Sequence, residues 1–421
     1  MFRETDSAKP THGFRVGRTL AFWGLAATLV CFLFASSAPS PLYVVYQDEW
    51  GFSASTLTSV FAVYALFLLA TLLVAGSVSD RVGRRPALLV ALAIEIVGML
   101  VFSDAQSVAW LFAARILQGI GTGIAMGTIS AALLDLQPED DPRLGALLGV
   151  IAPLVGLALG ALSAGVLVEY GPEPTRLVYW LLLGLFALAV LFALTIPETV
   201  RTDGEWLGSL RPSVAVPDAI RPAFVAAIPC MAATWALGGL VLSLGPSLTA
   251  GVLGESSHVT GGLPIFILAG VSAVTSVQVR DAHARSTARG GLVALIAGVA
   301  IVLVALGAGS IVLFMAGAAI AGLGFGPAFA GAFRALSTQA PLDQRAALVS
   351  AILAASYLSF SLPAVAAGAA VSSIGLHEVA NVYGAVLIGL AALALLLSSR
   401  LQDPQGSETQ RARVAEPCFE C

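Results

Sequence analysis

The sequence predicts an all-α integral membrane protein with twelve membrane-spanning helices, and three observations lead to that prediction. Of its 421 residues, 58% are hydrophobic and only 11% are charged, with a mean hydropathy of +0.91, whereas soluble domains are about 25% charged. The apolar residues form continuous runs and do not alternate as they would in a membrane β-barrel. Roughly twelve runs reach the ~20 residues that one helical crossing needs. A soluble fold is therefore excluded.

The predicted spans form two sets of six, separated by the longest polar stretch of the chain. The first set is expected at residues 19–38, 54–78, 86–103, 108–134, 144–168 and 177–196, and the second at 221–249, 260–279, 290–308, 310–333, 345–373 and 379–399. We therefore expect an N-terminal tail (1–18), a six-helix half (19–196), a linker (197–220), a second six-helix half (221–399) and a disordered C-terminal tail (400–421).

Basic residues predict the orientation of the chain in the membrane. Every one except Arg115 and Arg176 lies in a tail or in alternate connections, while the opposite loops carry acids such as Asp104 and Glu255. The positive-inside rule then predicts an even number of spans with both termini cytoplasmic, in an inner or plasma membrane. The polar stretch 1–18 precedes a full-length span and indicates a tail, not a cleaved signal. A single lysine among the basic residues, with abundant alanine and glycine, is typical of a bacterial source.

A charged loop between the second and third predicted spans carries the clearest motif. It contains Gly76, Asp80, Arg81, Gly83, Arg84 and Arg85. These six residues match the G-x-x-x-D-R-x-G-R-R loop of the major facilitator superfamily, which the chain resembles. The resemblance implies that Asp80, Arg81 and Arg85 latch two pseudo-symmetric six-helix halves together in the outward-open state. The alternative from composition alone is a basic loop that only sets topology.

An internal repeat supports the two halves. The segment 117–123 (L-Q-G-I-G-T-G) aligns with 320–326 (I-A-G-L-G-F-G), and 138–140 aligns with 341–343 at the same offset. The second half also carries a degraded echo of the charged loop, at Arg280, Asp281, Arg285 and Arg289. Parallel six-helix repeats with a site at their interface are the arrangement that the resemblance implies.

Arg115 lies inside the predicted span 108–134. A guanidinium there costs about 2.5–3.5 kcal/mol on insertion scales, so it persists only where it meets water, a carboxylate or a ligand. Arg115, Gln118 and Gly119 resemble an R-x-x-Q-G motif of proton-coupled members of the superfamily. That resemblance implies a role in proton and substrate coupling. The alternative is an arginine that extends to the outer interface.

Glu95, in the span 86–103, is the natural partner for Arg115. Both residues are equally far along the chain from the turn at Ala105, so they lie at nearly equal depth. We hypothesise that protonation of Glu95 depends on whether substrate engages Arg115. A fixed structural ion pair, or an acid that faces a gap between helices, is the alternative.

The span 144–168 contains Pro153, Gly156 and Gly160 and partly resembles the glycine–proline motif of exporters. The step before the proline is Ala152, where that motif has glycine. Small residues for tight helix packing explain the same pattern without any transport role.

Aromatic and polar side chains in several spans are the candidates for lining a central cavity. They are Phe32, Phe34, Ser36, Trp235, Phe325, Phe329, Tyr357 and Phe360. An apolar, aromatic cavity with one or two charges suits a lipophilic compound, including a cationic one. It suits a sugar less well, because sugar sites need many polar groups.

Enzyme chemistry finds no support in the sequence. The four histidines are not paired at metal-ligand spacing, and no phosphate-binding glycine loop with lysine is present, so ATP is not the expected energy source. Cys418 and Cys421 are expected to belong to the tail and not to a metal site. We expect no cofactor, a proton gradient as the energy source, and a monomer in the lipid bilayer that handles protons and a small-molecule substrate without nucleic acid.

The resemblance to twelve-helix drug:proton antiporters implies a secondary transporter that works by alternating access and exports small lipophilic compounds. Uptake of a sugar or another metabolite is the second transport interpretation. A membrane sensor that transports nothing is the alternative from another class, and the charges of Glu95 and Arg115 argue against it.

Overall fold

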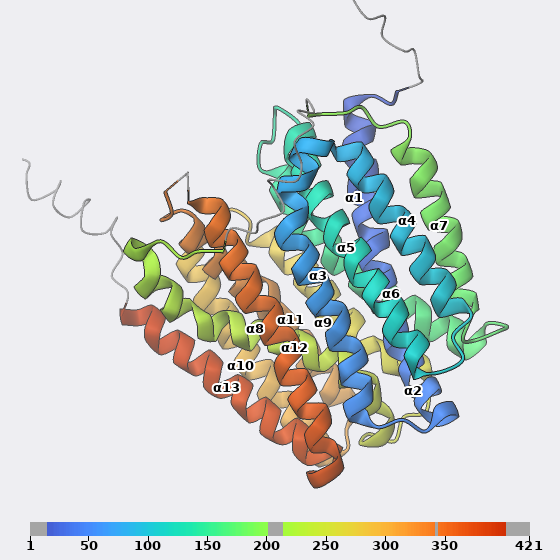
Figure 1. The fold of residues 1–421 in the computed structure, drawn as a ribbon. Helices are drawn as coiled ribbons and strands as arrows, with labels where there is room; N and C mark the ends of the chain where they lie inside the picture. The colour runs from blue at the N-terminus through green and yellow to red at the C-terminus, as the bar shows by residue number, and fades with distance from the viewer. Residues whose placement is uncertain (1–14, 201–213, 342–343, 401–421) are drawn as a thin grey trace, which may run out of the picture.

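The computed structural model describes residues 15–200, 214–341 and 344–400, and nearly all of them are helical (Figure 1). Within these ranges eleven segments are long and apolar enough to cross a membrane, and α7 is a shorter apolar helix. The chain is therefore an all-helical membrane protein with about twelve spans. The helices are α1 (Arg18–Ser37), α2 (Pro39–Trp50), α3 (Ala54–Val82), α4 (Arg84–Ser103), α5 (Val108–Leu136), α6 (Leu144–Tyr170), α7 (Leu177–Ala193), α8 (Arg221–Gly251), α9 (His258–Gln278), α10 (Ala284–Ala308), α11 (Ile311–Ser337), α12 (Arg345–Ile374) and α13 (Leu376–Arg400).

The predicted spans agree with these helices to within about four residues, except for the first and for the start of the span 290–308, because α10 begins six residues earlier, at Ala284. The first span was predicted to end at residue 38, but helix continues as α2 to Trp50 after a break at Ala38. The break occurs because Pro39 and Pro41 lack the N–H groups that would continue the hydrogen-bond ladder of α1. Residues 401–421, with Cys418 and Cys421, lie outside the described residues, as do most of the linker's residues.

The internal repeat is visible in how α5 and α11 pack. In α5, Gly119 lies against the backbone of α3, while Gly121 lies against the backbone of α4. In α11, Gly322 lies against α9 and Gly324 against α10. Each of these glycines permits a backbone approach that a side chain would block, so the repeated glycine spacing builds the same three-helix packing twice.

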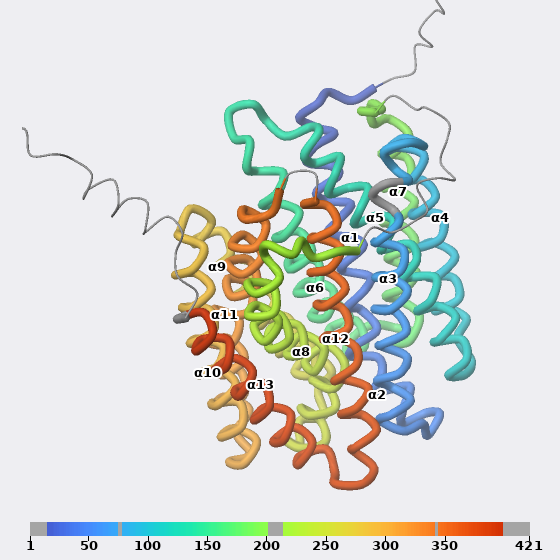
Figure 2. The backbone as a smooth tube through the Cα atoms, turned by 60° about the vertical axis from the view of Figure 1, so that its left-hand side comes forward, coloured from blue at the N-terminus to red at the C-terminus, as the bar shows by residue number. Residues whose placement is uncertain are grey.

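The helices α1–α7 and α8–α13 occupy opposite sides of the molecule (Figures 1 and 2). They meet along two long contacts, between α3 and α12 and between α6 and α9. We call the helices before residue 200 the first half and those after residue 214 the second half.

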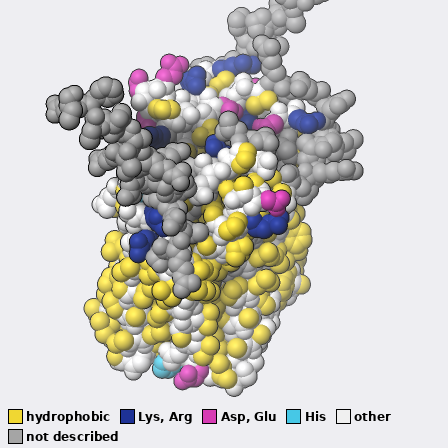
Figure 3. Space-filling view, turned by 90° about the vertical axis from the view of Figure 1, so that its left-hand side faces the viewer, with side chains coloured by type: hydrophobic (Ala, Val, Ile, Leu, Met, Phe, Trp, Pro, Cys, Tyr) yellow, Lys and Arg dark blue, Asp and Glu magenta, His cyan; other side chains and the backbone are white. Residues whose placement is uncertain are grey.

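A broad apolar surface surrounds the molecule, as a bilayer requires. Large apolar side chains such as Leu188, Val304 and Leu396 are each 63% exposed. On the face drawn in Figure 3 hydrophobic side chains form a nearly continuous yellow band, and Lys and Arg side chains gather above it. We call the end that carries the α3–α4 and α9–α10 loops the basic end.

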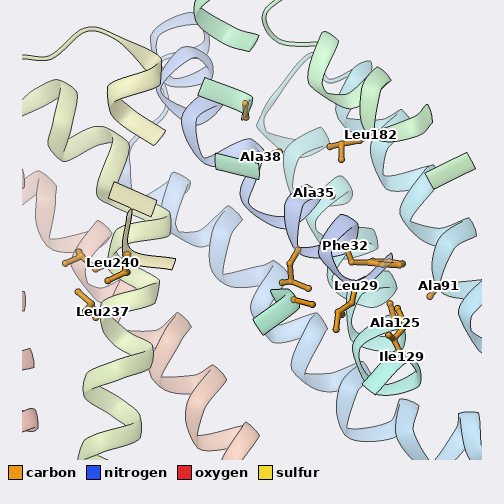
Figure 4. Packing of buried hydrophobic residues seen from close by; sticks show 14 of the residues in the cluster. Leu29, Phe32, Ala35, Ala38, Ala91, Ala125, Ile129, Leu182, Leu237 and Leu240 are labelled. Atoms are coloured by element: carbon orange, nitrogen blue, oxygen red, sulfur yellow. The ribbon is translucent and has the colours of Figure 1, made fainter. Parts of the chain in front are cut away.

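Inside the first half, α1 packs against α5 through fully buried apolar residues (Figure 4). Leu29 and Phe32 of α1 belong to the same buried cluster as Ala125 and Ile129 of α5. This packing fixes the position of α5 relative to the break in α1, where the polar residues of both helices meet.

Candidate functional site

The break between α1 and α2 provides backbone acceptors inside the first half. Pro39 has no N–H, so the carbonyl of Ala35 lacks its helical donor. That carbonyl instead accepts a hydrogen bond from Nε2 of Gln118 at 2.9 Å. The carbonyl of Ser36 accepts one from Nη1 of Arg115, also at 2.9 Å. The proline step therefore holds two polar side chains of α5 in place.

Arg115 has no exposed surface. Its Nε donates to the hydroxyl of Tyr43 at 2.5 Å, and its Nη1 also donates to Oε1 of Gln118. The guanidinium carbon lies 5.4 Å from the centre of the Tyr43 ring and 5.1 Å from that of Tyr64, within the range of cation–π attraction. Its Nη2 has no hydrogen-bond partner among the described residues. The Arg115 side chain therefore lies inside the first half and does not extend to the outer interface.

Glu95 is also fully buried, on α4. Its Oε1 accepts from Nε2 of Gln118 at 3.3 Å, and its Oε2 has no partner among the described residues. Arg115 and Glu95 do not form an ion pair with each other among the ion pairs of the described residues. Gln118 lies between the two charges and contacts both, so the acid and the cation are bridged and not directly paired.

Tyr64 and Ser36 complete the site from α3 and α1. The hydroxyl of Tyr64 donates to Oγ of Ser36 at 2.7 Å, and Oγ of Ser36 donates to the carbonyl of Phe32 at 2.9 Å. We call this set the buried polar cluster: Ser36, Tyr43, Tyr64, Glu95, Arg115 and Gln118. It joins one cation, one acid and several hydroxyl groups away from water, and ionisable groups buried within membrane spans indicate a functional site.

A second cluster lies between the halves, and we call Phe61, Trp235, Phe329, Tyr357 and Phe360 the aromatic cluster. The Trp235 ring centre is 4.8 Å from that of Tyr357 and 5.4 Å from that of Phe329. Phe360 lies 5.0 Å from Phe61 of α3, which comes from the first half. The predicted cavity residues Trp235, Phe329, Tyr357 and Phe360 are thus brought together by α8, α11 and α12.

The other predicted cavity residues lie elsewhere. Phe32 stacks edge-on with Phe186 of α7, with ring centres 5.3 Å apart, inside the first half. Phe34 packs beside α6, where its carbonyl faces Gly160. Phe325 lies against Gly238 of α8 and belongs to the packing of the second half.

The arginine-rich loop is held by acids of the first half. Asp80 forms an ion pair with Arg84 at 2.5 Å, and Nε of Arg84 lies 3.3 Å from the carboxylate of Asp135 on α5. Arg84 also donates to Oγ of Ser79 at 2.6 Å. Gly83 has a φ of +105°, which disfavours any other residue there. These contacts join α3, α4 and α5 within one half.

Glu198, which follows α7, caps the N-terminus of α4. Its Oε1 accepts from the backbone N–H of Arg84 at 2.8 Å, and its Oε2 from that of Arg85 at 3.1 Å. A carboxylate satisfies two helix-terminal donors there and lies at the positive end of the helix dipole. The end of the first half is thereby tied to the loop of Arg84 and Arg85.

The ion pairs between the halves at the basic end come from other residues. Arg143 lies 3.4 Å from Asp281, and Arg280 lies 3.9 Å from Asp141. At the opposite end Oε2 of Glu169 on α6 accepts from the backbone N–H of His258 on α9 at 2.7 Å. The halves are therefore joined by polar contacts at both ends.

The glycines of α6 allow this helix to pack closely against α1. A Cβ at Gly156 would stand 2.5 Å from the carbonyl of Val30, and one at Gly160 would collide with the carbonyl of Phe34. Pro153 lies inside α6 one turn earlier. The packing role proposed for this motif accounts for both glycines here.

Sequence reasoning missed several residues of these clusters. Tyr43 lies beyond the predicted end of the first span, although Pro39 and Pro41 just before it are a signal for a kinked helix. Tyr64 and Phe61 are ordinary aromatic residues of an apolar run, and no sequence pattern distinguishes them.

Comparison with known proteins gives the same family for much of the chain. Residues 25–280 match the family described as Major Facilitator Superfamily. A probable transporter, AQR1, of Saccharomyces cerevisiae is 28% identical over 43% of this chain and 31% of its own length. The multidrug transporter MdfA of Yersinia pestis is 33% identical over 31% of this chain and 32% of its own length. The chain thus covers about a third of the length of these curated relatives.

Solved structures support the fold across nearly the whole chain. A mutant of the nucleoside transporter NupG superimposes with a TM-score of 0.70 at 13% identity, over 90% of this chain and 100% of that one. A POT family transporter in complex with 5-aminolevulinic acid superimposes with a TM-score of 0.71 at 16% identity, over 92% and 97%. At these identities the likeness concerns the fold alone.

Proposed function

This chain belongs to the Major Facilitator Superfamily, and on that premise we propose that it is a proton-driven exporter of small lipophilic compounds. It is a multi-pass membrane transporter with a small-molecule substrate, not an enzyme. The proposal concerns the finer points: export, protons as the coupling ion, and an apolar and aromatic substrate.

One observation carries the proposal: Tyr64 belongs to the buried polar cluster and also packs against residues of the aromatic cluster. Its hydroxyl contacts Ser36 and its ring lies beside the Arg115 guanidinium, while its side chain packs in one apolar cluster with Tyr357 and Trp235. A compound that separates the halves at the aromatic cluster must move Tyr64, and Tyr64 contacts the residues that surround the buried charges. Binding and protonation are therefore linked through one side chain.

The chemistry of the two clusters suits export of an apolar compound. The aromatic cluster offers ring faces and few polar groups, which favour lipophilic and cationic compounds. Glu95 is an acid without full hydrogen bonding, separated from Arg115 by one amide. A proton taken up or released at Glu95 changes the net charge of the buried polar cluster, and Gln118 connects that change to Arg115. The relatives named as multidrug transporters support the same substrate class.

Orientation and conformational change belong to the same proposal. The positive-inside rule places the basic end and both termini in the cytoplasm. Alternating access then requires the contacts at the two ends to break in turn. We assign Arg143–Asp281 and Arg280–Asp141 to the cytoplasmic closure, beside the loop that carries Asp80.

The test is export in a drug-sensitive host and proton release in vesicles. Expression should raise tolerance to lipophilic cations such as ethidium, and Arg115→Ala should abolish that tolerance. Arg345→Ala, an exposed arginine of α12, is the matched control and should retain it. Glu95→Gln should bind ethidium but release no protons on substrate addition. Accumulation of a labelled nutrient instead would show uptake, and neither activity would indicate a sensor.

A further inference from the structure

Two of the three arginines in the second half's echo of the charged loop have partners within the chain. Arg280 pairs with Asp281 and Asp141, and Arg285 donates to the carbonyl of Ser398 at 2.7 Å. Arg289, one helical turn further along α10, is exposed and makes no hydrogen bond or ion pair with the described residues. An exposed guanidinium beside the apolar belt, without a partner among the described residues, is available to an anion from outside the chain.

Arg289 lies at the edge of a groove between α10 and α13. The groove has a volume of about 580 Å³ and is lined by Arg289, Gly290, Val293, Ala392, Leu395 and Leu396. Apart from the guanidinium, its walls are hydrocarbon. Val293 is 57% exposed and Leu396 63% exposed, so the groove opens onto the surface that faces lipid. In Figure 3, which faces α13, Lys and Arg side chains lie where the apolar band gives way to the basic end.

The depth of the groove fits the boundary between headgroups and hydrocarbon. The 25 residues of α10 span about 37 Å at 1.5 Å per residue, which exceeds a hydrocarbon core of about 30 Å. Arg289 lies in the second turn from the basic end of α10, close to the hydrocarbon boundary, where its long side chain reaches the headgroups, while Val293 lies one turn deeper. On α13, Leu395 and Leu396 lie in the last two turns. A cation at the headgroup and an apolar channel below it match the two parts of a phospholipid.

We propose that the α10–α13 groove binds one anionic phospholipid, with its phosphate on Arg289 and an acyl chain along Val293, Ala392 and Leu396. A guanidinium prefers a lipid with net negative charge, because a zwitterionic headgroup brings its own cation to the same place. The proposal is independent of the transported compound and concerns the outer wall of the second half.

Substitutions at two positions separate the headgroup contact from the acyl-chain contact. Arg289→Ala removes the cation, and Arg289→Lys keeps it. Gly290→Leu fills the groove: a Cβ at Gly290 meets nothing within 4 Å, so the larger side chain enters open space, and leucine also favours helix more than glycine does. Arg345→Ala is the control, because Arg345 is an exposed arginine at the same end, on α12.

The experiment is native mass spectrometry of the delipidated full chain, titrated with phosphatidylglycerol, phosphatidylcholine or inorganic phosphate. Wild type should bind one phosphatidylglycerol in preference to phosphatidylcholine. Arg289→Ala should weaken phosphatidylglycerol binding about fivefold, which corresponds to about 1 kcal/mol per basic residue at an anionic surface. Arg289→Lys and Arg345→Ala should bind as wild type does. Gly290→Leu should weaken both lipids equally and unfold at the wild-type temperature or above.

Several results would overturn the proposal. Equal binding of the two lipids by wild type would remove the headgroup contact, and equal losses in Arg289→Ala and Arg345→Ala would indicate bulk attraction only. Tight binding of inorganic phosphate would show an anion site without an acyl chain. A dimer in lipid-free detergent that Gly290→Leu abolishes would identify a second copy of the chain as the occupant.

Discussion

Removing the hydroxyl of Tyr43 isolates the contribution of a charged hydrogen bond at the α1–α2 break. Tyr43→Phe deletes one oxygen and keeps the ring that lies 5.4 Å from the Arg115 guanidinium carbon. The lost oxygen accepts from Nε of Arg115 at 2.5 Å. Since Nη2 already lacks a partner among the described residues, the variant leaves a second buried donor of the same cation unpaired.

The expected loss follows from the charge and the burial. Hydrogen bonds between helices in membranes average about 0.6 kcal/mol, but bonds to charged groups contribute about 1.5–3 kcal/mol. Arg115 has no exposed surface, so water cannot replace the missing acceptor. We therefore expect Tyr43→Phe to lower the free energy of unfolding by about 1.5–3 kcal/mol.

Tyr383→Phe is the matched control. Tyr383 is also a buried tyrosine, and its hydroxyl donates to the neutral carbonyl of Ala236 at 2.9 Å. That substitution should cost only about 0.5–1.5 kcal/mol. Reversible unfolding of both variants in mixed detergent micelles measures the difference. If Tyr43→Phe costs no more than Tyr383→Phe, the guanidinium is not stabilised by Tyr43 and the account of the buried polar cluster is wrong.

Three further predictions concern the packing and the caps. Gly121→Ala should lower the free energy of unfolding by about 1–3 kcal/mol, because the new Cβ would stand 2.8 Å from a buried carboxylate oxygen and 3.1 Å from a backbone carbonyl of α4. Gly149→Ala is the control and should be neutral, because the nearest atom to its Cβ is 3.9 Å away. Equal unfolding midpoints for the two variants would contradict this prediction. Glu198→Ala should cost about 1 kcal/mol as a lost helix cap, seen as faster hydrogen exchange at the start of α4, and unchanged exchange there would refute the cap. Glu169→Ala should lower the unfolding temperature more than His258→Ala, since the backbone donor of residue 258 survives the second change; the reverse order would assign the contact to the imidazole.

Much of the fold followed from one-dimensional signals. Apolar runs of about 20 residues predict membrane helices because every backbone polar group in hydrocarbon must bond within its own segment. The first span was wrongly predicted to end at residue 38, because polar residues and prolines there indicated the end of a helix. The helix instead continues to Trp50, as the need to bond every backbone group within the segment requires. Proline removes a donor but does not forbid helix when a neighbouring side chain such as Gln118 satisfies the freed carbonyl.

The candidate site was predictable only in part. Arg115 and Glu95 stood out because charge in a membrane span is costly, and their similar depth could be counted from the shared turn. That Gln118 lies between them could not be counted, because it depends on the rotation of α4 and α5 about their axes. That rotation is decided by close contacts such as Gly121 against the backbone of α4.

The sequence alone determined that this chain crosses a membrane about twelve times, repeats itself, and buries an arginine, because hydropathy and charge act locally along the chain. Only the tertiary structure decided which side chains meet that arginine, which acids hold the loop at the basic end, and which aromatic residues close the contact between the halves. Those partners lie far apart in sequence, and the geometry that joins them comes from how the helices pack against one another.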